Sequence, residues 1–207
     1  MTEKQILEKS LVLFNQKGYA QVGMRELARE LSISPGNLTY YFKKKEDVLS
    51  ALLKQFSSHN TQLYQTFQNV KPTNANFLRL TRSIFENQYA YRGVYIGNQF
   101  VQKAITENNL FEYEEVVIRR KDAYSDIFRL LENSGHLKLK GDDVSFLVAY
   151  MTLFGRFWIT EATLFNKVPK SDEVISHYIH LLAKQLSLFS TNVGLISIEE
   201  FLKVDGS

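Results

Sequence analysis

Two short helical patterns, at residues 24–31 and 35–41, are separated by only three residues of the chain. In the first pattern, Met24, Leu27, Ala28 and Leu31 recur at helical spacing. The second opens with Ser34 and Pro35, a preferred N-cap followed by the residue best suited to the first helical position. The spacing therefore predicts two short helices joined by a tight turn, the helix-turn-helix arrangement.

Longer helical patterns flank this pair on both sides. The preceding one starts at Thr2, has Gln5 in the position of a capping-box partner, and stops at Gly18. The following one starts at residue 46 and runs to residue 68, with Glu46 and Asp47 complementing the positive end of the helix. Further helices are expected at 74–91, 94–106, 110–134, 142–166 and 171–190, and residues 198–204 either dock as a last helix or fray.

No strand-like alternation bounded by hairpin turns occurs, so the sequence predicts an all-α protein. We expect an N-terminal three-helix helix-turn-helix domain over residues 1–56, joined by a long helix to a helical ligand-sensing and dimerisation domain over residues 57–207. The first of these holds nine basic and six acidic side chains, which accounts for the whole net charge of +3. This excess is small, and its position matters more than its size.

The chain has no cysteine, which excludes disulfides and thiolate chemistry and favours a cytoplasmic location. No signal peptide is visible at the N-terminus. The most apolar stretch, residues 146–165, is interrupted by Arg156 and Glu161, so we expect a buried helix there and no membrane partner.

In a helix-turn-helix the second helix enters the major groove of double-stranded DNA with its N-terminal residues at the base edges. Leu38 and Phe42 belong to the core, which leaves the other side chains of that helix free for DNA. Three lysines follow at once, where they could bind phosphates. The predicted DNA-binding residues are Arg25, Pro35, Gly36, Asn37, Thr39, Tyr40, Tyr41, Lys43, Lys44 and Lys45.

The stretch from Ile6 to about Phe56 resembles the TetR family of bacterial regulators. The resemblance is carried by Leu13-Phe14, Lys17-Gly18-Tyr19, Met24-Arg25-Glu26-Leu27-Ala28, and the run from Gly36 to Glu46. It implies that Arg25 reaches a base, that Lys45 binds a phosphate, and that the protein is a dimeric repressor controlled by a small-molecule effector.

Three positions depart from the family pattern. Thr39 stands where tyrosine is usual, Tyr41 where histidine is usual, and Gly23 where serine or threonine often caps the second helix. These changes affect the expected operator sequence more than DNA binding itself. The alternative is a helical small-molecule-binding or protein-interaction module that has lost DNA binding. An activator with the same architecture is also open.

The last two long helices carry apolar stripes that suit either a four-helix homodimer interface or the core of a single chain. We favour the dimer, because a two-fold protein matches a palindromic operator. The predicted interface residues are Val148, Met151, Ile175, Tyr178, Ile179, Leu182 and Leu186.

Aromatic residues concentrate after residue 56, which indicates either an effector pocket or ordinary core packing. The predicted pocket residues are Phe85, Tyr89, Phe100, Tyr113, Tyr124, Phe128, Phe154 and Trp158. His177 and His180 stand three apart but have no evident third ligand, so we expect no metal and no cofactor. No catalytic constellation is recognisable, and we expect no enzyme.

Overall fold

The computed structural model describes residues 2–95, 97–108, 110, 113–164 and 170–205. Within these ranges every regular element is a helix, and the single exception is an isolated bridge between Leu137 and Ser190. The all-α prediction is confirmed. Among the same residues, no helix combines the length and the apolar composition that a membrane crossing requires.

The chain divides into two compact units that are interleaved in sequence. The first consists of residues 1–59 and 88–114, and the second of residues 60–87 and 115–207. The predicted domains 1–56 and 57–207 concern function and stay a prediction, because a compact unit and a functional domain are different divisions of a chain.

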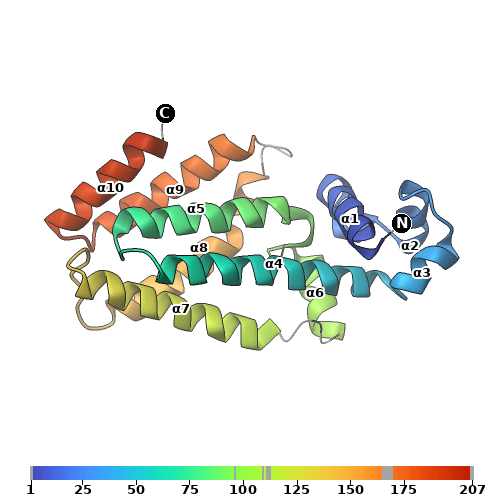
Figure 1. Ribbon diagram of the computed structural model, residues 1–207, viewed down its shortest axis with the longest axis horizontal. Coiled ribbons are helices and arrows are strands. Elements are labelled where there is room, and N and C mark those ends of the chain that lie inside the picture. The colour runs from blue at the N-terminus through green and yellow to red at the C-terminus, as the bar shows by residue number, and fades with distance from the viewer. Residues whose placement is uncertain (1, 96, 109, 111–112, 165–169, 206–207) are drawn as a thin grey trace. The chain divides into compact units, whose positions relative to one another are not determined.

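The first unit contains the elements that the N-terminal pattern predicts (Figure 1). They are α1 (Glu3–Lys17), the short 3-10 helix η1 (Tyr19–Gln21), α2 (Met24–Glu30), α3 (Pro35–Tyr41) and the start of α4 (Lys45–Gln68). Thr2 and Gln5 form the predicted capping box. Gly18 ends α1 at φ 83°, a backbone conformation that favours glycine.

The first unit also contains η2 (Arg92–Val94) and α6 (Gln99–Asn108). Asn15 of α1 holds this segment with both ends of its side-chain amide: Nδ2 donates to the carbonyl of Ala90 and Oδ1 accepts from the backbone N–H of Gly93, both at 2.7 Å. Val94, Val101 and Ile105 join the buried core of α1 to α4. Residues far from the N-terminus therefore complete the core of the helix-turn-helix unit.

The helix expected at 94–106 begins five residues later than predicted, at Gln99. Asn98 is the reason, because its carbonyl accepts from the N–H of Gln102 at 3.0 Å and its side chain accepts from the N–H of Phe100 at 2.9 Å. Asparagine is among the most favoured N-cap residues, so this signal was present in the sequence.

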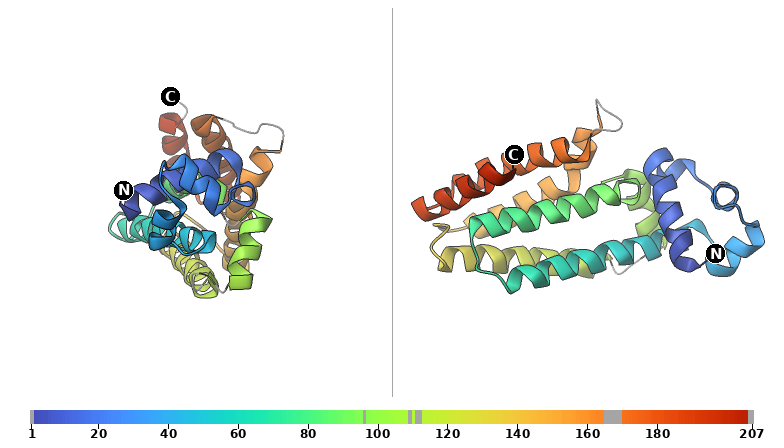
Figure 2. Two further views of the ribbon diagram at one scale, coloured as in Figure 1. Left: turned by 90° about the vertical axis from the view of Figure 1, so that its right-hand side faces the viewer. Right: turned by 45° about the horizontal axis from the view of Figure 1, so that its top comes forward.

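The second unit holds the end of α4 together with most of α5 (Asn74–Ala90) and α7 (Tyr113–Asn133), and all of α8 (Asp143–Ala162), α9 (Ser171–Ser187) and α10 (Asn192–Asp205). Figures 1 and 2 show these helices running along one another. The helix expected at 142–166 ends at Ala162, and its positions 165 and 166 lie outside the described residues.

The C-terminal segment is a docked helix rather than a frayed end. α10 packs beside α9 and is twice as long as the expected piece at 198–204, with Ile198 and Phe201 buried. Its last residue, Asp205, has a buried carboxylate that accepts from Nη1 of Arg82 on α5 at 2.6 Å. The far end of α10 is thereby tied to the body of the unit.

Candidate nucleic-acid interface

Helix α3 is positioned by its N-terminus and by one core residue. The Ser34 hydroxyl accepts from the N–H of Asn37 at 3.1 Å, and Pro35 occupies the first turn, as predicted. Leu38 has no exposed surface and Phe42 is buried directly after the helix. Burial of these two residues fixes which side of α3 turns outward.

The outward side holds almost all of the predicted DNA-binding residues. The exposed members of the set are Arg25 on α2 and Pro35, Gly36, Asn37, Thr39, Tyr40, Tyr41, Lys43 and Lys44 on or just after α3. Tyr40 is 84% exposed, and its ring meets that of Tyr41 edge-on at 5.3 Å. Apolar aromatic surface of this extent is costly in water and suits a partner that covers it.

Thr39 and Gly23, two of the departures from the family pattern, do not present an unbonded hydroxyl group on this face. The Thr39 hydroxyl donates to the carbonyl of Gly36 at 3.1 Å, one turn back in its own helix. Gly23 is the N-cap of α2 and supplies no side-chain hydrogen bond there. A hydroxyl from position 23 is therefore absent from this face, and the one at position 39 is occupied by the helix backbone.

Lys45 differs from its two neighbours because its ammonium is held inside the unit. Nζ donates to the carbonyl of Tyr19 at 2.9 Å and lies 4.1 Å from the centre of the Tyr19 ring. Burial lowers the pKa of Lys45, and the nearby Glu46 carboxylate works in the opposite direction. The same Glu46 accepts from the Tyr19 hydroxyl at 3.3 Å. The half-buried Lys45 thus joins α4 to η1, whereas Lys43 and Lys44 are exposed.

The predicted pocket aromatics fall into separate groups. Tyr89, Phe100 and Tyr113 belong to the first unit, where Phe100 is 51% exposed. In the second unit Phe85 stacks on Trp158 with ring centres 4.7 Å apart and lies 6.2 Å from Phe154.

Tyr124 and Phe128 form another stack in the second unit, and the ring of Phe77 lies tilted against that of Phe128. Phe85, Phe128 and Trp158 are buried in the single chain. The aromatic effector pocket stays a prediction, and any ligand there would have to open packed rings.

The predicted dimer residues are mostly core residues of one chain. Met151, Ile175, Tyr178, Ile179, Leu182 and Leu186 are all buried, and Val148 is half-buried. The docked α10, which the sequence pattern left open, lies beside the same helix α9.

The exposed apolar residues of these helices lie elsewhere on them: Phe146, Leu153 and Phe157 on α8, with Leu181 on α9 and Leu188 at its end. Phe146, Leu153 and Phe157 are seven and four residues apart, and Leu181 and Leu188 are seven apart. The sequence contains this pattern, but the apolar residues on the other sides of α8 obscure it.

The two histidines of α9 contact different neighbours. His180 Nε2 lies 3.6 Å from the Asp205 carboxylate, and His177 meets the ring of Tyr178 edge-on. Among the residues that the structure describes, no three histidine or acidic side chains gather as a metal ion requires.

Comparison with known proteins agrees with this geometry. Residues 6–52 match the model of bacterial regulatory proteins of the tetR family. The probable HTH-type transcriptional regulator YttP of Bacillus subtilis is 26% identical over 138 residues, which cover 65% of this chain and 64% of YttP. The aligned region thus spans slightly less than two thirds of that relative.

Two solved structures share the fold over nearly the whole chain. A TetR-family transcriptional regulator from Marinobacter aquaeolei VT8 is 20% identical with a TM-score of 0.83, covering 99% of both chains. SmeT, the repressor of the Stenotrophomonas maltophilia multidrug efflux pump SmeDEF, is 14% identical with a TM-score of 0.67, covering 93% of this chain and 92% of SmeT.

The two short helices, with the second one exposed, form a helix-turn-helix, the arrangement that a class of DNA-binding proteins uses. The segment that carries it, residues 6–52, is that of the TetR family.

Proposed function

We propose that this chain is a transcriptional repressor that binds a palindromic operator as a homodimer and releases it when a small molecule binds the C-terminal domain. The observation that carries the proposal is the exposed side of α3, where polar and aromatic side chains face solvent while Leu38 and Phe42 anchor the helix. A recognition helix needs this division between a core side and a reading side.

Within this face the roles follow from chemistry. Asn37 offers an amide that can both donate and accept at a base edge, and exposed Gly36 allows close approach of the backbone. The Tyr40 hydroxyl reaches a phosphate, and the exposed ammonium groups of Lys43 and Lys44 add charge beside it. Lys45 contributes mainly by fixing α4 to η1, since its ammonium is already engaged.

The homodimer is proposed to form through the exposed apolar strip of α8 and α9. Phe146 lies 5.8 Å from the ring of Phe189, just after Leu188, so the strip is continuous across the two helices at this end. Leu153 and Leu188 are 64% and 74% exposed. A second copy that presents the same strip covers it by two-fold symmetry, as a palindromic operator requires.

Effector control is supported by the proteins that share the fold. They include a gamma-butyrolactone receptor and the ketosteroid transcriptional regulator KstR2 of Mycobacterium tuberculosis, each at a TM-score of 0.71. Helix α4 starts four residues after α3 ends and continues as one helix to Gln68. We propose that it transmits the state of the effector site to α3, because a ligand that favours one of two arrangements lowers DNA affinity by its differential affinity for them.

The test is in-vitro selection of duplex DNA by the purified protein at two salt concentrations. We expect a palindrome with half-sites about 34–36 Å apart, or a multiple of this spacing, and an affinity that falls steeply as salt rises. Selection of no sequence, together with the lack of any salt-dependent binding of DNA, would contradict the proposal and favour a module without DNA binding. A reporter gene behind the selected site separates repression from activation.

A further inference from the structure

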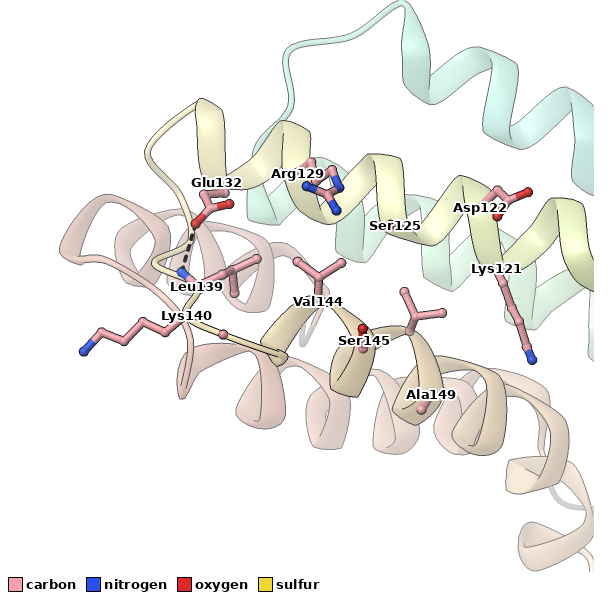
Figure 3. Close-up of a pocket in the computed structure, with 12 residues that line it drawn as sticks. Lys121, Asp122, Ser125, Arg129, Glu132, Leu139, Lys140, Val144, Ser145 and Ala149 are labelled. Atoms are coloured by element: carbon pink, nitrogen blue, oxygen red, sulfur yellow. Dashed lines mark hydrogen bonds between the residues drawn. The ribbon is translucent and has the colours of Figure 1, made fainter.

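A groove of about 510 Å³ runs between α7 and α8 in the second unit (Figure 3). Its residues come from one side of each helix and from the loop that joins them. On α7 they include Lys121, Asp122, Ser125, Arg129 and Glu132, on α8 Val144, Ser145, Val148 and Ala149, and in the loop Leu139, Lys140 and Gly141. The volume is in the range of small-molecule sites, and none of the aromatic residues of the predicted effector pocket lines it.

The end of the groove beside the loop between α7 and α8 is held in place by hydrogen bonds of that loop. The N–H of Leu139 donates to Glu132 Oε1 at 3.3 Å, the dashed line in Figure 3, and the N–H of Lys140 donates to Asp143 Oδ2 at 2.7 Å. The N–H of Lys138 donates to the carbonyl of Phe189 at 2.9 Å, which ties the loop to the end of α9. A ligand at this end therefore meets walls that are already formed.

The two helices contribute different chemistry to the lining of the groove. The contribution of α7 is entirely polar, whereas α8 and the loop add aliphatic surface from Leu139, Val144, Val148 and Ala149. Across the described residues, the guanidinium of Arg129 forms neither a hydrogen bond nor an ion pair with another side chain. Arg129 lines the groove from α7, whereas in Figure 3 the Lys140 side chain extends away from it.

We propose that this groove binds a small monocarboxylate with a short aliphatic chain, at a site distinct from the predicted aromatic effector pocket. The planar guanidinium of Arg129 matches a carboxylate with two parallel hydrogen bonds, and Ser125 and Ser145 offer further hydroxyl donors. Val144, Val148 and Leu139 cover the aliphatic part.

The charge balance selects a monoanion over a phosphate dianion. Lys121 and Arg129 offset Asp122 and Glu132, and the Lys140 side chain extends away from the groove, so the lining carries no excess positive charge. A second negative charge on the ligand would meet the two carboxylates without a cation to offset it.

The test titrates hexanoate into the full chain labelled for NMR, with hexanol, acetate and inorganic phosphate as comparison probes. We expect saturable chemical-shift changes confined to residues 121–149 at about millimolar hexanoate. Hexanol, which lacks the carboxylate, and acetate, which lacks the aliphatic chain, should bind much more weakly. Arg129→Gln should weaken hexanoate binding at least about tenfold. Arg119→Gln, the same charge change at an exposed α7 residue outside the lining, should leave it unchanged.

A second variant, Ser145→Phe, fills the groove from an exposed position of α8 and keeps Arg129 in place, so it should abolish the shifts without unfolding the chain. Equal binding of hexanol and hexanoate, equal effects of the two arginine variants, or preferred binding of phosphate would each overturn the proposal. So would hexanoate shifts centred on Phe85 and Trp158, because these place the ligand in the aromatic core. DNA is absent from this experiment, so its outcome is independent of the repressor proposal.

Discussion

Gly93 lies against the backbone of α1, and this contact sets a strict limit on its side chain. A Cβ atom at this position would lie 2.3 Å from both the carbonyl carbon and the carbonyl oxygen of Phe14. Backbone atoms cannot rotate away, so Gly93→Ala has to move η2 off α1 and strain the hydrogen bond from the Gly93 N–H to Asn15. We expect a loss of about 1–3 kcal/mol in the free energy of unfolding, measured by urea denaturation.

Gly36→Ala is the matched control. Nothing lies within 4 Å of a Cβ built at Gly36, and alanine is the better helix former. This variant should unfold at the same or a slightly higher urea concentration. If Gly93→Ala were equally stable, the close contact of η2 with α1 would be wrong.

His136 makes the stability of the second unit depend on pH. It is buried, and its Nδ1 accepts from the N–H of Asn74 at 3.4 Å, which requires the neutral ring. Burial, with a smaller contribution from the positive charge of Lys71, lowers the pKa of His136. The unfolded chain therefore takes up the proton first. We expect the contribution of neutral His136 to the free energy of unfolding to be fully present above about pH 6.5. It should decrease as the pH falls towards the pKa of His136 in the folded chain.

The measurement is urea denaturation at a series of pH values between about 7.5 and 5.5, compared among variants. His136→Gln should be less stable at neutral pH and lose part of the decline towards acid. His177→Gln, at an exposed position of α9, should keep the wild-type slope. An unchanged slope in His136→Gln would show that other groups cause the acid dependence.

Helix α3 carries a core residue on one side and the predicted DNA-binding residues on the other, so substitutions on the two sides should affect different properties. Tyr40 is 84% exposed, so Tyr40→Ala should leave the free energy of unfolding within about 0.5 kcal/mol of wild type. The same change should weaken operator binding by about 1–3 kcal/mol in a gel-shift or anisotropy titration, because it removes a phosphate or base contact.

Leu38→Ala is the opposite case and serves as the control. Leu38 is completely buried, so its truncation should cost about 2–5 kcal/mol of stability and lower DNA binding only through unfolding. Normal operator affinity in a folded Tyr40→Ala protein would mean that this side of α3 does not face DNA.

The elements that local chemistry specifies were predicted well. Caps at Thr2 and Ser34 and the stop at Gly18 depend on residues within one turn, and the structure confirms all three. The start of α6 was missed although Asn98 marked it, because the apolar residues from Val94 onward suggested a helix earlier. Asn15 and Gly93 could not be paired from sequence, since their contact joins positions 78 residues apart.

At the scale of the whole molecule, periodicity identifies an apolar side of a helix but not what covers it. Ile175, Ile179 and Leu182 of α9 are buried within one chain, in a unit to which the docked α10 adds Ile198 and Phe201. Since α8 is apolar on several sides, the choice between core and interface depended on knowing the position of α10. The structure leaves a different strip of α8 and α9 exposed, and this strip makes the dimer proposal testable.

Leu153 lies in this strip and is 64% exposed, so a charge there does not disturb the folded single chain. Leu153→Glu should nevertheless abolish the homodimer, because two-fold symmetry buries two copies of the carboxylate in one apolar interface. We expect sedimentation to show a monomer with wild-type helix content. Operator affinity should drop by orders of magnitude, since one half-site contact replaces two.

Ile118→Glu supplies the matched control on α7, where the replaced side chain is 59% exposed and outside the strip. It should remain a dimer and bind the operator as wild type does, apart from a small effect of the added negative charge. A Leu153→Glu protein that sediments as a dimer would assign the interface to another surface of the second unit. A monomer that keeps full operator affinity would instead separate dimerisation from DNA recognition and contradict the palindromic model.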